Sequence, residues 1–203
     1  LKYYPKLKNS CLVFNNFINT REIIEKSKIT IPEKKEKGKI LFIFVGRLDD
    51  SSKKLNRAFF LIKNIKNTTL WIVGDGPDKE KYVNQVKTQK IENSVHFLGA
   101  KKNPYPYIKI ADYILLTSDY EGFPVTYLEA ITLRKKIITT IDVSDDKINI
   151  GKDYATIIPK QEAEMIKVVE KELRHPRKAK NIDLEKIQIE RMKKLEEIFD
   201  EVV

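Results

Sequence analysis

Two glutamates stand on either side of a turn sequence. Glu121 precedes Gly122-Phe123-Pro124, and Glu129 lies eight positions after Glu121. Proline is favoured as the first residue of a helix, so we expect a helix to begin near residue 124. The first backbone N–H groups of that helix, around Val125 and Thr126, lack helical partners and suit a phosphate. The two carboxylates could bracket a ligand there; alternatively, Glu129 is a surface helix residue and Glu121 a cap.

A second group of residues is cationic. Arg47 directly follows the apolar run of residues 40–46, and Lys53 and Lys54 come shortly after it. The arginine fork can bind two phosphate oxygens at once, and lysine adds a point charge. An isolated basic pair is most often simply solvated. The basic residues therefore indicate a phosphate-binding site only if the fold brings them close to residues 121–129.

Other motifs argue against two kinds of site. The segment Gly74-Asp75-Gly76-Pro77 shares part of a dinucleotide fingerprint, but it lacks the third glycine and follows the second apolar run. We interpret it as a turn and not as an NAD site. With one cysteine, two separated histidines and no Asp-x-Asp sequence, no metal is expected to be required.

Six apolar runs must position these residues. Most end in glycine or a small polar residue, and they cover residues 40–46, 69–74, 94–99, 112–118, 136–140 and 155–159. Continuous apolar runs are typical of strands buried on both faces of a parallel sheet. Apolar residues at helical spacing occur between several of them, within residues 55–65, 82–91 and 125–133. The sequence predicts an α/β fold with a doubly wound, Rossmann-like, six-stranded and mostly parallel sheet.

In such sheets the ligand lies beyond the carboxyl ends of the strands. Gly46, Gly74, Gly99 and Ser118 end four of the predicted strands, so the loops that they open are expected at one edge. The cations after residue 46 and the carboxylates after residue 118 then converge, and this convergence indicates a phosphate-binding site.

The two ends of the chain differ from its middle. A strand is predicted at residues 11–14 and a short helix at 20–28, with Asn19 as its N-cap. Residues 33–39 form a charge run that indicates a linker. Amphipathic helices are predicted at 162–173 and 183–203, and the apolar stripe of the second helix must pack on something.

Composition excludes several classes of protein. The chain has 203 residues with 41% hydrophobic residues, enough for one real core. Its single cysteine, Cys11, cannot form an internal disulfide, and its longest apolar run is far shorter than a membrane span. The net charge of +10 would suit nucleic acid or an anionic membrane, but lysines interleaved with acids usually mark a solvated surface.

The motifs together resemble a known family. They are the sequences VGRL (45–48), KK (53–54), IVGDGP (72–77), VHFLGAKKNPYPYIKIAD (95–112) and LLTSDYEGFPVTYLEA (115–130). In this order they resemble the carboxyl-terminal, donor-binding half of a GT-B glycosyltransferase. The most similar class is the retaining family 4 type of bacterial polysaccharide synthesis.

This resemblance implies roles for individual residues. Arg47 and Lys53 would hold the diphosphate of a nucleotide-sugar donor and neutralise the leaving group, with Lys54 as a substitute for Lys53. Glu121 would accept hydrogen bonds from sugar hydroxyls, and Glu129 would bind the ribose. The backbone N–H groups of Gly122, Phe123, Val125 and Thr126 would contact the sugar or phosphate. Gly46 and Gly99 would also be substrate-binding residues, and the loop after Gly99 would border the base. Arg47, Lys53 and Glu121 would thus serve catalysis, without a cofactor or metal.

The resemblance also implies a division of the chain. Residues 1–38 would be a remnant of the amino-terminal half and the interdomain linker, 39–174 the nucleotide-sugar-binding domain, and 175–203 a terminal linker and helix. A glycan or lipid-linked acceptor would bind through the amino-terminal half, so we expect little hexosyltransferase activity from this chain alone. A cytoplasmic location is implied, with peripheral association at the inner face of the membrane left open.

Two departures from the family keep another function open. The helix after Glu129 ends in Leu133-Arg134-Lys135-Lys136 where the family usually has Gly-Lys-Pro, and residues 142–150 lack the expected glycine-rich turn. A catalytically silent binding or scaffold module of the same fold is therefore the alternative. A nucleic-acid binder is motivated by the net charge alone, and no nucleic-acid partner is expected.

Overall fold

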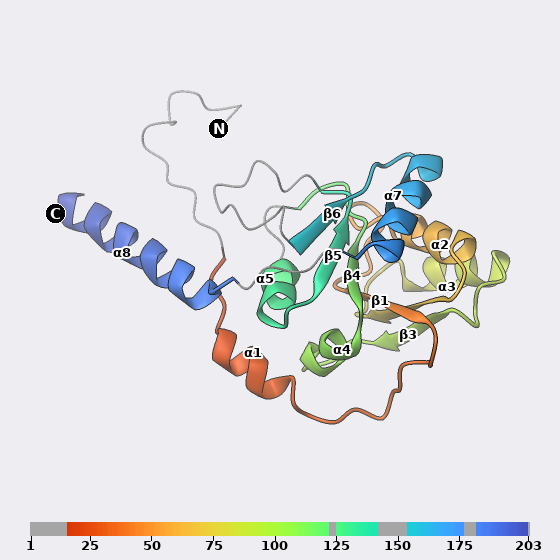
Figure 1. Ribbon diagram of the computed structural model, residues 1–203, viewed down its shortest axis with the longest axis horizontal. Coiled ribbons are helices and arrows are strands. Elements are labelled where there is room, and N and C mark those ends of the chain that lie inside the picture. Colours follow the sequence, from red (N-terminus) through yellow and green to blue (C-terminus); the bar gives the residue numbers. More distant parts are fainter. Residues whose placement is uncertain (1–15, 122–124, 142–153, 177–181, 203) are drawn as a thin grey trace.

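The computed structural model describes residues 16–121, 125–141, 154–176 and 182–202 (Figure 1). Its centre is a six-stranded sheet in which every neighbouring pair of strands is parallel, with the order β3-β2-β1-β4-β5-β6. The strands are β1 (Ile40–Val45), β2 (Thr68–Val73), β3 (Val95–Gly99), β4 (Tyr113–Leu116), β5 (Lys136–Thr139) and β6 (Ala155–Ile157). All six predicted strands and the parallel sheet are confirmed.

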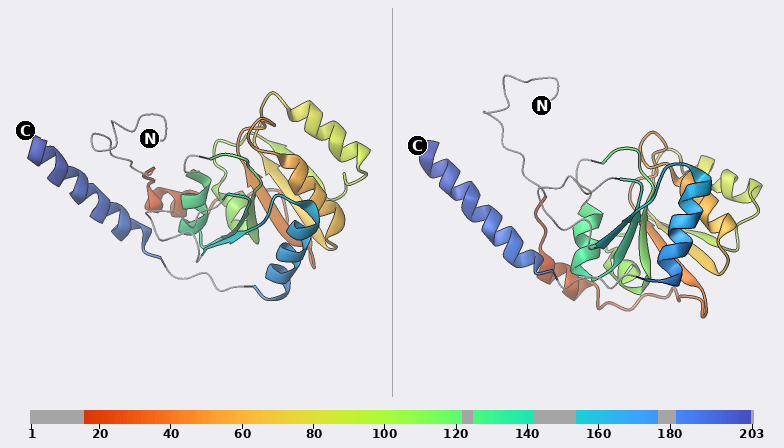
Figure 2. Two further views of the ribbon diagram at one scale, coloured as in Figure 1. Left: turned by 90° about the horizontal axis from the view of Figure 1, so that it is seen from above. Right: turned by 45° about the horizontal axis from the view of Figure 1, so that its top comes forward.

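Helices cover both faces of this sheet (Figures 1 and 2). One face carries α2 (Leu55–Asn64), α3 (Lys79–Thr88) and α7 (Glu162–Arg174), and the other carries α4 (Tyr105–Ile110) and α5 (Val125–Thr132). The central strands are buried from both sides: in β1, Phe42 and Phe44 face the first helix group, and Leu41 and Ile43 face the second. Because both faces of these strands are buried, their sequences are uninterrupted apolar runs.

Two short helices show what local sequence can and cannot predict. The helix α1 (Thr20–Lys26) begins as expected, because the Asn19 side chain accepts a hydrogen bond from the Glu22 backbone N–H at 3.0 Å. The helix α4 was not predicted, since its sequence YPYIKI contains a proline and shows no full helical period. The strand predicted at residues 11–14 lies outside the described residues.

The last helix, α8 (Leu184–Val202), packs on the domain through its first turns. Leu184 and Gln188 are buried, and the Gln188 amide exchanges hydrogen bonds with the backbone N–H and C=O of Ile18, at 2.8 and 3.0 Å. Beyond them the helix projects away from the sheet in every view (Figure 2). Ile189 and Met192 are about half exposed. Across the described ranges, no helix has the length and apolar character needed to cross a membrane.

Candidate functional site

The strand order reverses between β1 and β4, which lie side by side although β2 and β3 come between them in the chain. Loops from such neighbours leave in opposite directions and open a crevice at the carboxyl edge of the sheet. The β1 strand ends at Val45 and continues into Gly46 and Arg47, while β4 ends at Leu116 and leads to Glu121. The predicted cations and the first predicted carboxylate therefore follow adjacent strands.

Three hydrogen bonds tie the loop of residues 46–54 and the first turn of α2 to the loop of residues 117–121. The Asp119 backbone N–H donates to the Ser52 carbonyl at 2.8 Å, and the Thr117 hydroxyl donates to the Lys53 carbonyl at 3.1 Å. Arg57, in the first turn of α2, donates to the Thr117 carbonyl at 2.9 Å. These bonds hold the cationic loop against the acidic loop.

The contact between Lys53 and Glu121 is the central feature of this edge. Lys53 Nζ lies 2.5 Å from Glu121 Oε1, and the Ser118 hydroxyl donates to the same oxygen at 2.7 Å. Only 22% of the Lys53 side chain and 12% of the Glu121 side chain are exposed. An ammonium and a carboxylate are thus held together at the carboxyl edge between β1 and β4, 68 residues apart in the sequence.

Arg47 is exposed on the same loop. Within the described part of the chain, no acidic side chain forms an ion pair with its guanidinium. The loop behind it is closely packed: a Cβ built on Gly74 would lie 1.8 Å from the Gly46 carbonyl oxygen, and one on Gly76 would lie 2.4 Å from that of Leu48. The segment Gly74-Asp75-Gly76-Pro77 thus forms the β2–α3 loop that supports the Arg47 loop.

The glycine that ends β3 belongs to the same edge. The Gly74 backbone N–H donates to the Gly99 carbonyl at 2.9 Å, and Gly99 has a φ of +71°. A non-glycine residue would be strained at that φ. Because β2 separates β3 from β1, Gly99 lies at the far side of the crevice from Glu121.

The beginning of α5 rests beside the end of β1. The Thr126 hydroxyl donates to the Val45 carbonyl at 3.5 Å, and Val125 is exposed. The first N–H groups of this eight-residue helix therefore lie next to the Arg47 loop. Gly122 and Phe123, which were expected to contribute their backbone, lie outside the described residues.

Glu129 is buried, which contradicts the alternative that it is a surface residue of the helix. Its exposed fraction is 9%, and burial raises the pKa of its carboxyl group, partly offset by a hydrogen bond from Tyr105. Tyr105, which the sequence reasoning did not single out, belongs to α4. Only the packing of α4 against the sheet brings it to Glu129, so no local signal could have identified it.

A second group that sequence reasoning missed surrounds Asp119. Its carboxylate lies 2.9 Å from Lys160 Nζ and 2.9 Å from Arg57 Nη2, and these contacts with Lys160 and then Arg57 hold its pKa below the usual range. Lys160 also lies 5.9 Å from the ring centroid of Tyr120, whose side chain is largely exposed. The charges around Asp119 thus anchor the loop that carries Glu121.

Comparison with known proteins matches this architecture. The family model of the glycosyl transferases group 1 matches residues 25–185. An uncharacterized glycosyltransferase of Methanocaldococcus jannaschii is 28% identical over 148 residues, which cover 68% of this chain and 36% of that protein. The lipopolysaccharide 1,6-galactosyltransferase of Salmonella typhimurium is 34% identical over 113 residues, covering 53% of this chain and 31% of that protein. The chain spans about a third of the length of these curated relatives.

A solved structure shares the fold. The Anabaena protein HepE, in complex with UDP and glucose, superposes with a TM-score of 0.55 at 19% identity, covering 68% of this chain and 40% of HepE. The resemblance to the carboxyl-terminal domain of a GT-B glycosyltransferase is therefore confirmed for fold and family. With the family model matching most of its length, the chain belongs to the glycosyl transferases group 1.

Proposed function

We propose that this chain binds the nucleotide-diphospho-sugar donor of a retaining glycosyltransferase that extends a glycan or lipid-linked acceptor. The observation that carries the proposal is the Lys53–Glu121 contact at the crevice between β1 and β4, beside Arg47 and the start of α5. Relatives named for lipopolysaccharide galactosyl transfer, and a neighbour that holds UDP and glucose, support it.

Each side chain has a place in this reaction. Arg47 and Lys53 bind the diphosphate, and Glu121 accepts hydrogen bonds from the sugar. The bond between the anomeric carbon and the diphosphate oxygen breaks while the acceptor oxygen attaches to the same face of the sugar. The acceptor proton passes to the departing phosphate. Two fixed cations stabilise the charge that grows on the phosphate, so positioning and electrostatics supply the catalysis without a metal.

The pairing of Lys53 with Glu121 also prepares the site. Ser118 holds the Glu121 carboxylate, Thr117 holds the backbone of Lys53, and the two charged side chains hold each other, so the donor meets a cation and an acceptor that need little reordering. Glu129 lies deeper, next to Tyr105, where a carboxylate would receive the ribose hydroxyls. In this proposal Lys53, and not Lys54, is the diphosphate ligand, since Lys53 is the one that contacts Glu121.

Calorimetric titration with UDP and UDP-glucose tests the proposal, because Lys53 and Lys54 form a matched pair of variants. We expect Arg47→Ala and Lys53→Ala each to weaken binding by about tenfold or more, since each removes charge-assisted hydrogen bonds. Lys54→Ala should change it less than threefold. Equal effects of Lys53→Ala and Lys54→Ala, or no effect of Arg47→Ala, would contradict the assignment.

A second measurement distinguishes binding of the nucleotide sugar from transfer of the sugar. The full-length protein that contains this chain should transfer sugar with retention, seen as an unchanged anomeric configuration in the NMR spectrum of the product. The chain alone should bind the donor but transfer little. Donor binding without transfer by the full-length protein would instead support a silent binding module.

A further inference from the structure

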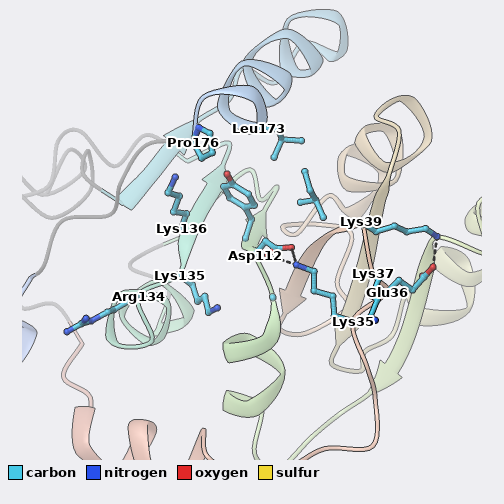
Figure 3. Close-up of a pocket in the computed structure, with 14 residues that line it drawn as sticks. Lys35, Glu36, Lys37, Lys39, Asp112, Arg134, Lys135, Lys136, Leu173 and Pro176 are labelled. Carbon is cyan, nitrogen blue, oxygen red and sulfur yellow. Dashed lines mark hydrogen bonds and ion pairs between the residues drawn. The ribbon is translucent and has the colours of Figure 1, made fainter.

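A hollow of about 1110 Å³ opens at the opposite edge of the sheet, where β1, β4 and β5 begin (Figure 3). Its two walls come from residues 35–39, which precede β1, and from residues 134–136 after α5, and the end of α7 contributes to its floor. Strand β1 rises by about 3.3 Å per residue, so this edge is roughly 20 Å from the Arg47 loop. The hollow is therefore separate from the candidate donor site.

The lining of this hollow is strongly cationic. It contains six basic and two acidic side chains, an excess of four positive charges: Lys35, Lys37, Lys39, Arg134, Lys135 and Lys136, with Glu36 and Asp112. The basic residues come from two opposite walls, with three on the segment before β1, two on the turn after α5, and Lys136 at the start of β5. Such a concentration of one sign of charge around a concave surface attracts anions.

Both acidic residues of the lining are already engaged. Asp112 lies 2.5 Å from Lys35 Nζ and also accepts from the Leu41 backbone N–H at 2.8 Å. Glu36 lies 2.7 Å from Lys39 Nζ. Figure 3 shows both pairs, Lys35–Asp112 near the middle of the hollow and Lys39–Glu36 on the side of the segment before β1.

The opposite wall keeps cations that the described acids do not neutralise. Lys136 lies 3.2 Å from the buried Glu172, but neither Lys135 nor Arg134 forms an ion pair with any acid of the described ranges. Lys135 is partly buried, and burial lowers the pKa of its ammonium group. The nearby Asp112 attracts this ammonium group but is already paired with Lys35, so a bound anion would relieve the remaining cost of burying the cation.

The floor between the two walls is apolar. It is formed by Ile40, Ala111, Tyr113, Leu173 and Pro176. Pockets that pair an apolar floor with a few charged groups at fixed positions are typical of small-molecule sites. The floor can receive the carbon part of a ligand, and the two cationic walls can each hold an anionic group.

We propose that this hollow binds a soluble molecule with two or more phosphate groups, at a second anion site independent of the donor crevice. The paired Lys35 and Lys39 fix one wall, while Lys37 and Lys135 form no ion pair with the acids of the described residues. Phosphate is the anion that lysine and arginine clusters recognise best through charge-assisted hydrogen bonds.

The test is an NMR titration of the isotopically labelled chain with inorganic pyrophosphate at constant ionic strength. We expect saturable shifts of the backbone amides of residues 35–39, 112 and 134–136. These shifts should persist in Arg47→Ala, which disables the candidate donor crevice. The double variant Lys37→Gln/Lys135→Gln should weaken this binding at least fivefold.

The matched control removes the same charge elsewhere. Lys63 and Lys66 are exposed at the end of α2, so Lys63→Gln/Lys66→Gln should leave the affinity unchanged. Melting curves establish that both double variants are folded. The proposal is overturned if the shifts rise linearly without saturation, if both double variants weaken binding equally, or if Arg47→Ala abolishes the shifts. Binding to phosphatidylglycerol vesicles without binding to pyrophosphate would also overturn it.

Discussion

At the scale of a single residue, Glu129 shows how burying a carboxyl group can cost a fold stability. The carboxyl group lies in the second turn of α5 with its pKa raised by burial, and the Tyr105 hydroxyl is its polar neighbour. A raised pKa in the folded state means that the folded protein binds the proton more tightly than the unfolded chain does. The contribution of Glu129 to stability is therefore greatest below its unfolded pKa and is lost as pH rises through its folded value.

Replacing this carboxyl group tests whether its buried charge lowers stability near neutral pH. Because a neutral amide keeps a hydrogen-bond acceptor for Tyr105, Glu129→Gln should raise the free energy of unfolding near pH 7. The gain should vanish below about pH 4, where the wild-type carboxyl is protonated in both states. Urea unfolding at both pH values measures the difference. A gain of equal size at both would show that charge is not its cause.

At the scale of elements, helix α5 ends without the glycine that is usual at such an end, yet the hydrogen bonds that close it are regular. The Lys135 N–H donates to the Ala130 carbonyl at 2.8 Å and the Arg134 N–H to the Ile131 carbonyl at 2.9 Å. This is the pattern of a Schellman motif. Arg134 occupies its left-handed position with a φ of +54°, where glycine is usual. The unusual sequence after Glu129 therefore does not change the shape of the turn.

Arg134→Gly should stabilise the chain by about 1 kcal/mol, because it removes the left-handed strain of a residue with a Cβ. Arg134→Ala is the control: it removes the same charge but keeps the Cβ, and it should give no gain. The comparison is made by urea unfolding. Equal stabilisation by both variants would assign the effect to charge and not to the backbone.

The loop that carries Glu121 depends on Arg57. This residue donates to the Thr117 carbonyl and pairs with Asp119, so it fixes two points of the loop after β4. Arg57→Ala should lower the free energy of unfolding by roughly 1–3 kcal/mol, since it leaves a carbonyl and a carboxylate short of a partner. Arg57→Lys, which keeps the charge, should lose less. Urea unfolding of the two variants measures both losses. Equal losses would contradict a stabilising role for the charge of Arg57.

At the scale of the whole molecule, α8 is joined to the domain through its first turns. Gln188 and Leu184 are buried, whereas Ile189 and Met192 are about half exposed. Segments with little buried apolar surface contribute little to global stability. Truncation after residue 189 should therefore shift the melting temperature by less than about 2 °C, whereas Gln188→Ala should lower it by about 4 °C or more. A large loss on truncation would show that the projecting half is docked in solution.

Much of the fold follows from the sequence because its signals are local. An apolar run that is buried on both faces can be recognised without knowing its neighbours, and so can a cap such as Asn19 or a glycine after a strand. These signals were sufficient for the six strands, the parallel sheet and the edge at which Arg47, Lys53 and Glu121 lie. The roles of these three residues in the donor site remain predictions.

What the sequence by itself determined is therefore the sheet and the identity of the candidate residues. Only the tertiary structure decided which partners they meet. The Lys53–Glu121 pair, the burial of Glu129 beside Tyr105 and the cationic hollow at residues 35–39 and 134–136 each join segments far apart in the chain. Such contacts depend on strand order and helix packing, which are set by the whole core and not by any one segment.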